Sequence, residues 1–412
     1  MKILVCGCYF TPDPIGGGKF TGEMAEWLAE RGHEVRAVMA PPFYPQWKVA
    51  EGYSGLRYQK ENLRGVTILR CPVYVPAHAS GARRLLQYAL FALSSAPAIW
   101  SWAISWKPDI VWSMAPPLAA SVPALMGARL AGARSWLHVQ DFEIDAAFEL
   151  GLLRAPAVRR LLLGAERRLM SAFDIASSIT PKMVSLLETK GVTAPKILFP
   201  NWVDLDAIHP LPDNSGLRDE LDIPRGAFVA LYSGNLGEKQ GVDDLVQVAR
   251  LLRDVPDFLM IVCGDGTGRA RLASQAGDLA NIRFLPLQPM EVFNRLLGMA
   301  DVHLLPQKAE IADLVMPSKL PGMLASGRPV VAGAQAEAQL AQEVAGCGAV
   351  VPPGDPVAMA DAVRRLMTDE AARRALGAAA ARRAAERWSK MSILLRFERE
   401  LMKLAAHGCS AK

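Results

Sequence analysis

Two loops of this sequence combine glycines with a lysine directly after a run of apolar residues. The first, residues 14–19, follows the apolar run 3–6, and the second, residues 233–241, follows the apolar run 227–232. Glycine lets backbone amides approach a ligand closely, and a following helix N-terminus favours negative charge, so both loops are suited to phosphate. The residues that we predict for phosphate binding are Gly16, Gly17, Gly18, Ser233, Gly234, Asn235 and Lys239.

A later segment offers a second lysine with the same chemistry. Ser318 and Lys319 stand at the expected start of a helix. Lys319 and Lys239 could then converge on one diphosphate and neutralise it as a leaving group. The alternative for each glycine loop is a tight strand-to-helix turn with no ligand.

Three further side chains are candidates for acid–base or orienting roles. Asp141 and Glu143 come directly after the predicted strand 135–139. Because α/β sheets bind ligands at the carboxyl ends of their strands, either carboxyl could contact a substrate hydroxyl. The alternative is that one of them caps a helix. His138 is a third catalytic candidate, although a histidine among apolar residues is often a hydrogen-bonded core side chain.

Several other chemistries are excluded by the motifs. A Walker A loop fails because Asp13 and Phe20 occupy its first glycine and its Ser/Thr position. Asp204 and Asp206 match a D-x-D metal motif, but they lie in a turn-rich passage where Asp204 is expected to cap the chain. The sequence contains no G-x-S-x-G, H-E-x-x-H or C-x-x-C element. We therefore predict neither a cofactor nor an obligatory metal.

The elements that position these residues follow an α/β rhythm. Eight short apolar runs alternate with helical stretches, which predicts parallel sheets buried on both faces. The runs are residues 3–6, 35–39, 110–112, 135–139, 228–232, 258–263, 302–305 and 330–332. A turn-rich passage divides the chain, and we predict domains at 1–200 and 217–386, a hinge at 201–216 and a C-terminal helix at 387–406.

Composition supports two globular domains in a reducing compartment. The 412 residues exceed the ~250 to 300 that one hydrophobic core usually serves. A net charge of +5 is too small to indicate a nucleic-acid partner. The six cysteines show no disulfide or zinc spacing. The first residues resemble a strand rather than a signal peptide, so we expect a cytoplasmic location.

The apolar segment 85–106 has no charge and contains Trp100, Trp102 and Trp106. A membrane crossing is disfavoured because the chain returns at once to a strand of the same predicted sheet. We expect an interfacial segment instead, with the tryptophans at headgroup level and arginines near anionic lipid. Those arginines are Arg83, Arg84, Arg154, Arg159 and Arg160. A helix pair buried inside the first domain is the alternative.

Nine short motifs occur in the order found in a known family. They are residues 9–18, 31–35, 107–111, 138–141, 200–204, 232–241, 264–266, 317–319 and 325–331. With these motifs the sequence resembles the retaining family-4 glycosyltransferases of the GT-B fold, and among them the transferases of colanic acid and related exopolysaccharide synthesis. The resemblance covers nearly the whole chain.

The resemblance implies two Rossmann-like domains facing a cleft, with a C-terminal helix that crosses back to the first domain. It also implies that the second half holds a nucleotide-diphospho-sugar and that the first half holds the acceptor. Gly264 and Gly266 are then further residues of the phosphate site. Lys239 matches the family's diphosphate lysine. Retention without an evident nucleophile favours front-face attack, in which the leaving phosphate helps to take the acceptor proton.

The sequence departs from the family at two places. The E-x₇-E element of many relatives is missing, because Leu314 and Gly322 stand at its two glutamate positions. The arginine that usually precedes the diphosphate lysine is replaced by Asn235 or Leu236. The carboxylates that would hold the ribose and sugar hydroxyls of the donor are therefore missing from these positions.

The resemblance implies transfer of a sugar from GDP-fucose or a UDP-sugar to a glycan on a polyprenyl diphosphate, at the inner face of the plasma membrane. Two alternatives stay open. One is a sugar-nucleotide 2-epimerase of the same fold, which needs no lipid-facing segment. The other is a catalytically silent, membrane-bound partner in polysaccharide assembly, which the missing glutamates would suit.

Overall fold

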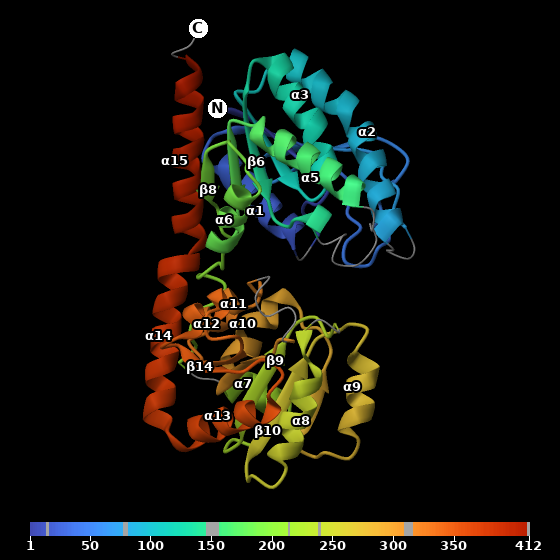
Figure 1. Cartoon of the computed structure of the whole chain (residues 1–412). Helices are drawn as coiled ribbons and strands as arrows, with labels where there is room; N and C mark the ends of the chain where they lie inside the picture. The colour runs from blue at the N-terminus through green and yellow to red at the C-terminus, as the bar shows by residue number, and fades with distance from the viewer. Residues whose placement is uncertain are drawn as a thin grey trace. The chain divides into compact units, whose positions relative to one another are not determined.

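All eight apolar runs that the sequence predicts as strands lie in strands of the computed structural model. The structure describes residues 1–13, 16–76, 81–145, 156–212, 215–237, 240–308 and 316–409. The chain divides into two units, one made of Met1–Asn201 with Ile393–Lys412 and the other of Trp202–Ser392. Figure 1 labels the elements of both units.

The first unit contains a sheet of eight strands in the order β3-β4-β2-β1-β5-β6-β7-β8. The described strands pair in parallel except for β3 with β4. They are β1 (Lys2–Cys6), β2 (Glu34–Met39), β3 (Gln59–Leu63), β4 (Val66–Arg70), β5 (Ile110–Ala115), β6 (Arg134–Val139), β7 (Ile175–Ser178) and β8 (Lys196–Leu198). Every residue of the central strand β5 is buried. Burial on both faces explains its continuous apolar sequence.

The helices of the first unit are α1 (Gly17–Glu30), α2 (Gly81–Ser105), α3 (Ser121–Ala131), α5 (Pro156–Ser171), α6 (Pro181–Thr189) and α15 (Lys390–Cys409), with a short 3₁₀ helix η1 at Leu118–Ala120. The helices α2 and α3 lie side by side (Figure 1) and share an apolar core with β1, β2 and β5. That core contains Phe91, Ile99 and Val111.

The second unit contains six strands, all paired in parallel, in the order β11-β10-β9-β12-β13-β14. They are β9 (Phe228–Ser233), β10 (Phe258–Cys263), β11 (Ile282–Leu285), β12 (Val302–Leu305), β13 (Val330–Gly333) and β14 (Gly348–Val351). The helices are α7 (Ser215–Glu220), α8 (Asp243–Leu251), α9 (Arg269–Ala276), α10 (Met290–Gly298), α11 (Leu320–Ala325), α12 (Gln339–Val344), α13 (Pro356–Thr368) and α14 (Glu370–Trp388).

Alternating side chains of β9 enter two different cores. Phe228, Ala230 and Tyr232 pack with α8, α9 and α13, whereas Val229 and Leu231 pack with α10, α11, α12 and α14. The alternation follows from the two-residue period of a strand. Both faces of the sheet are therefore covered, as the apolar sequence of β9 predicts.

The end of the chain returns to the first unit, since Ile393–Lys412 belong to it. The return confirms the fold-class prediction for the C-terminal helix. Phe397 of α15 stacks on Phe199 at 4.2 Å between ring centroids and meets Trp136 edge-on at 5.0 Å. Glu398 accepts hydrogen bonds from Arg31 and lies 2.9 Å from the His33 ring nitrogen.

The described part of the predicted hinge packs within the second unit. Trp202, Val203 and Ile208 are buried there, and Val203 pairs with Ser389. Asp204 accepts hydrogen bonds from the backbone N–H groups of Asp206 and Ala207, as a cap does. This matches the capping role that the sequence predicts for Asp204.

The tryptophans of segment 85–106 require a correction. Trp106 is buried and donates to Glu34 at 2.6 Å, and Trp100 donates to the Pro123 carbonyl at 3.1 Å. Trp102 lies under the guanidinium of Arg36. Trp100 and Trp106 pack on their own unit because their N–H groups find partners there, and Trp102 is half-buried against Arg36. Their predicted position at headgroup level is therefore wrong.

Leucines rather than tryptophans form the exposed apolar face of α2. Leu86, Leu90, Leu93 and Ile104 are exposed and repeat at helical spacing on one face. The neighbouring helix α3 exposes Val122, Met126 and Leu130. Among the described residues, no helix has both the length and the apolar character needed to cross a bilayer.

The aromatic cluster on α15 gives a test of this fold. Phe397→Ala should destabilise the first unit by about 3 to 5 kcal/mol, because it removes a buried ring between two others. The control Leu395→Ala changes a partly exposed side chain of the same helix and should have little effect. Chemical denaturation of both variants measures the difference, and equal losses would contradict the packing of α15 described above.

Candidate functional site

Lys319 lies against the loop that follows β9. Its ammonium group donates to the Tyr232 hydroxyl at 2.7 Å and lies 4.0 Å from the centroid of that ring. The Tyr232 hydroxyl in turn donates to the Asn235 carbonyl. A Cβ added at Gly234, where φ is +140°, would lie 3.0 Å from the Lys319 nitrogen. Glycine at 234 therefore gives the lysine its room, and the structure brings Ser233, Gly234 and Lys319 together.

The loop after β10 is held backbone to backbone against the loop after β9. A Cβ at Gly264 would lie 1.9 Å from the Gly234 carbonyl oxygen, and a Cβ at Gly266 would lie 2.6 Å from the Asn235 amide oxygen. Leu236 donates its N–H to the Asp265 carbonyl at 2.9 Å. Glycines are needed at 264 and 266 because no side chain fits between the two loops.

The ammonium group of Lys319 has no carboxylate partner in the part of the chain that the structure describes. Burial lowers the pKa of Lys319 to about 7, because the charged form loses hydration. An anion placed beside it would restore the charge. Ser318, the predicted neighbour, is exposed.

Two sequence predictions for this site fall outside the described residues. They concern Lys239, the predicted diphosphate lysine, and Leu314, the first position of the missing E-x₇-E element. Gly322, the second position, is described. A Cβ added there would contact the side chains of Leu297 and Ile208. A glutamate at 322 would thus start against the apolar core.

The glycine loop of the first unit folds closely around Asp13. A Cβ at Gly18 would lie 2.9 Å from the Asp13 Cβ and 3.1 Å from the Phe10 nitrogen. Gly16 has φ of +67°, and Gly17 begins α1. Asp13 is 4% exposed, and its carboxylate accepts from the Tyr44 N–H at 3.2 Å. Burial raises the pKa of Asp13 to about 6.

Glu143 is a buried carboxyl with one oxygen in use. Its Oε1 accepts from the Leu118 N–H at 2.9 Å, at the start of η1, while its Oε2 is buried without a hydrogen-bond partner. Burial raises the pKa of Glu143 to about 7, and Arg84 opposes that rise. One carboxylate oxygen of Glu143 is therefore engaged by the backbone of η1, and the other is buried without a partner among the described residues. Asp141 is exposed.

His138 behaves as a core residue. Its Nδ1 lies 2.9 Å from the Ser177 hydroxyl and its Nε2 lies 3.0 Å from the Gln140 amide nitrogen. The ring stacks on Trp112, and burial lowers the pKa of His138 to about 3. Both nitrogens are occupied and the ring is neutral, which favours the structural role over the predicted catalytic one.

A polar and aromatic cluster beside Glu143 was not predicted as part of the site. The hydroxyls of Tyr9 and Tyr88 are 3.4 Å apart, and Arg84 donates to Tyr88 at 2.9 Å. The Arg84 guanidinium also lies over the Trp47 ring. Arg84 and Tyr88 are four residues apart on α2, a spacing that could have indicated a shared face. Contact with lipid is the only role that the sequence predicts for Arg84.

The described residues contain no group of three or more His, Cys, Asp or Glu side chains placed to hold a metal ion. Asp204, from the D-x-D motif, pairs with Lys390 at 3.2 Å. Its carboxylate is thus engaged by its own unit.

Comparisons with known proteins agree with this geometry. Residues 16–202 match the family described as glycosyl transferase 4-like domain, and residues 213–383 match glycosyl transferases group 1. The putative colanic acid biosynthesis glycosyl transferase WcaI of Escherichia coli K12 is 42% identical over 350 residues, which cover 83% of this chain and 85% of WcaI.

Two solved structures share the fold at low sequence identity. Sucrose-phosphate synthase from Thermosynechococcus elongatus is 17% identical, with a TM-score of 0.76 over 98% of this chain and 99% of that one. HepE of Anabaena in complex with UDP is also 17% identical, with a TM-score of 0.71 over 98% and 100% of the two chains. The chain therefore belongs to the glycosyltransferases of the GT-B fold, in the family that includes WcaI.

Proposed function

We propose that this chain transfers a sugar, with retention of configuration, from a nucleotide-diphospho-sugar to a lipid-linked exopolysaccharide intermediate. The observation that carries the proposal is Lys319, a desolvated cation without a carboxylate partner among the described residues, set against glycine loops at the carboxyl ends of β9 and β10. The name of the relative WcaI supports a polysaccharide of the colanic acid type.

The donor's diphosphate would occupy the loops of the second unit. There Lys319 would stabilise the negative charge that develops on the leaving diphosphate. Gly264 and Gly266 hold the loops after β9 and β10 in contact. The loop against which Lys319 lies is therefore formed before the sugar nucleotide binds. GDP-fucose or a UDP-sugar is the donor that we propose, and the UDP complex of HepE, which shares the fold, supports a nucleotide diphosphate.

The acceptor would contact Glu143 in the first unit. At neutral pH this carboxyl carries a proton part of the time, and its free Oε2 can either donate to a hydroxyl or accept from one. The leaving phosphate would take the acceptor proton in a front-face attack, and Glu143 would orient the acceptor hydroxyl. The half-buried Tyr9 and Trp47 offer rings for a sugar beside it.

The lipid part of the acceptor accounts for the apolar face of α2 and α3. Exposed leucines on α2 and the exposed arginines 83, 159 and 160 of the same unit suit the interface of an anionic membrane. Arg154, also predicted to face lipid, lies outside the described residues. We therefore propose a peripheral position at the inner face of the plasma membrane.

Incubation with labelled UDP- and GDP-sugars, with and without a lipid-diphosphate glycan, tests the function. Sugar transfer that requires the lipid glycan is the expected result. Epimerisation of a free sugar nucleotide would identify a 2-epimerase instead. Silence with every donor would favour a non-catalytic assembly partner.

Lys319→Gln should weaken binding of the donor nucleotide by about 10- to 100-fold, because it removes a charge-assisted contact. Lys390→Gln, which removes a lysine that pairs with Asp204 in the same unit, is the matched control and should bind normally. Isothermal calorimetry with UDP and GDP measures both. Unchanged affinity in Lys319→Gln would exclude the lysine from the site.

The same calorimetry at pH 8 should reveal proton uptake. Lys319 is mostly neutral there, above its pKa of about 7, and the bound diphosphate should recharge it. The binding heat of the wild type should then depend on the buffer's ionisation enthalpy, and that of Lys319→Gln should not. A buffer-independent heat for the wild type would contradict the proposed contact.

Glu143→Gln should lower transfer while leaving donor affinity unchanged. The Glu143→Gln change should also remove a pH dependence of stability. A carboxyl whose pKa is raised to about 7 in the fold contributes its full stabilisation below its ordinary pKa. This stabilisation is lost as the pH rises through 7. From pH 5 to pH 8 the wild type should lose about 2 to 3 kcal/mol more than Glu143→Gln.

Urea unfolding at several pH values measures this difference, and Glu51→Gln, which changes an exposed carboxyl of the same unit, serves as its control. Parallel pH profiles for the wild type and Glu143→Gln would show that Glu143 is ionised in the fold, against the proposed role.

Replacing Leu86, Leu90 and Leu93 together with Ser should reduce binding to phosphatidylglycerol vesicles by about tenfold or more, since exposed apolar side chains are lost from the interface. Salt should weaken the wild type's binding by screening its arginines. Leu287→Ser, an exposed leucine of the second unit, is the control. Vesicle sedimentation measures the bound fraction. Equal bound fractions of the triple variant and the wild type would show that this face does not contact the membrane.

A further inference from the structure

The second unit contains a polar cavity at the edge of its sheet opposite to Lys319. The cavity has a volume of about 350 Å³ and is lined by Asp301, Arg328 and Arg373, among others. Asp301 stands just before β12, and Arg328 and Pro329 stand just before β13. Ser233, by contrast, ends β9. Since the strands are parallel, the cavity and the proposed donor loops lie at opposite strand ends.

A glycine on α14 builds one wall of this cavity. A Cβ added at Gly377 would lie 2.3 Å from the Gly327 carbonyl oxygen, so only glycine lets the helix approach the segment before β13 so closely. Arg373 is one helical turn before Gly377 and lies on the same face of α14. The close approach places Arg373 in the same cavity wall as Arg328.

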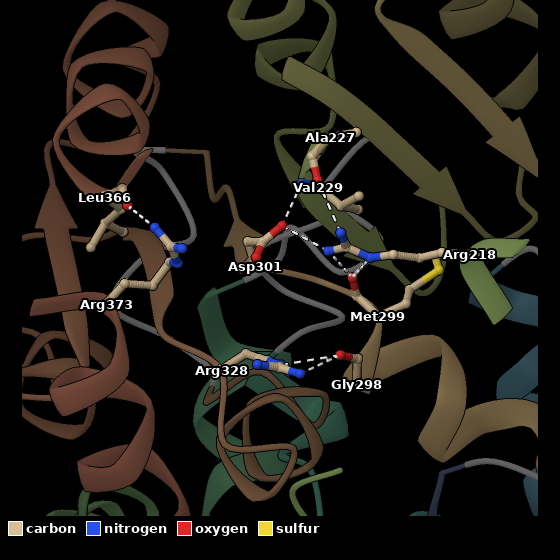
Figure 2. Close-up of polar contacts among 9 residues, drawn as sticks. All are labelled: Arg218, Ala227, Val229, Gly298, Met299, Asp301, Arg328, Leu366 and Arg373. Carbon is tan, nitrogen blue, oxygen red and sulfur yellow. Dashed lines mark hydrogen bonds and ion pairs between the residues drawn. The ribbon is translucent and has the colours of Figure 1, made fainter. Parts of the chain in front are cut away.

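Figure 2 shows how the charged groups around the cavity are engaged. Asp301 accepts from Arg218 at 2.7 Å and from the Val229 N–H at 2.8 Å. Arg374, another lining residue, pairs with Glu370. Both lining carboxylates are therefore already paired with an arginine.

Arg328 and Arg373 donate to backbone carbonyls, and the Arg373 guanidinium also lies 5.3 Å from the centroid of the Phe228 ring. Arg328 donates twice to the Gly298 carbonyl, at 3.1 and 2.7 Å, and Arg373 donates to the Leu366 carbonyl at 2.7 Å (Figure 2). Neither forms an ion pair with a carboxylate among the described residues. Within the described ranges, two positive charges in one small polar cavity thus have no carboxylate at ion-pair distance.

The pKa of Arg328 reflects the same excess of positive charge. Burial lowers the pKa of Arg328, Asp301 opposes that change, and the positive charges of Arg218 and Arg373 add to it. An anion would relieve the repulsion between these arginines. Their planar guanidinium groups match the oxygens of a phosphoryl group better than a lysine would.

We propose that this cavity is a second anion site of the chain and binds a small phosphorylated compound. Its volume lies near the lower end for small-molecule pockets, which suits inorganic phosphate or a hexose phosphate rather than a complete sugar nucleotide. The ligand would join α14 to the segments before β12 and β13 and so stabilise the second unit. The site does not depend on the proposed function.

The test must separate this site from the donor loops, which also suit phosphate. Isothermal calorimetry is therefore carried out in a Lys319→Gln background, with inorganic phosphate and with a hexose 1-phosphate, against chloride at the same ionic strength. Arg373→Gln in that background should weaken binding by about tenfold or more. Arg382→Gln, an exposed arginine of α14 outside the cavity, is the matched control and should not change it.

Arg328→Gln provides a second variant, with thermal unfolding to establish that each variant is folded. The site is supported if either phosphate compound still binds in the Lys319→Gln background and binds more weakly once Arg373→Gln is added to it in a folded protein. The compound that binds more tightly, inorganic phosphate or the hexose 1-phosphate, identifies the ligand class. Loss of all binding in Lys319→Gln, or equal binding in Arg373→Gln and Arg382→Gln, would overturn the proposal.

Discussion

The contact between Lys319 and Tyr232 is the interaction on which the proposed donor site depends. A lysine ammonium that is buried without a carboxylate partner among the described residues is costly, because it gives up its hydration. The Tyr232 hydroxyl and ring stabilise part of that charge, and Gly234 leaves room for it. An anionic ligand would supply the remaining stabilisation, which explains why this arrangement is useful to a protein that binds a diphosphate.

The two units use the same architecture for different chemistry. In the second unit, glycines at 234, 264 and 266 lock two loops together around a cation. In the first unit, Gly18 closes a loop around Asp13, and a second buried carboxyl, Glu143, has a raised pKa. One unit thus presents a lysine ammonium, and the other presents buried carboxyls whose pKa values are raised towards neutrality; in the proposed function the first meets the leaving group and the second an acceptor hydroxyl.

The sequence was sufficient for the central strands and the glycine loops, because buried parallel strands are continuous apolar runs and glycines mark close approaches. It did not predict six short strands that lie at or next to the edges of the two sheets, namely β3, β4, β7, β8, β11 and β14. The direction of the tryptophans in α2 was wrong, because apolar content alone does not say which side faces α3. The contact of Lys319 with Tyr232 joins residues 87 positions apart and required the fold.

Hydrogen–deuterium exchange of the intact chain with and without GDP or UDP tests the central claim most directly. The account predicts slower exchange at the amides of residues 234–237, 264–268 and 318–320 when the nucleotide is bound, with little change at the strand ends near Arg328. Nucleotide binding that leaves these three loops unprotected would contradict the assignment of Lys319 and its glycine loops to the donor diphosphate.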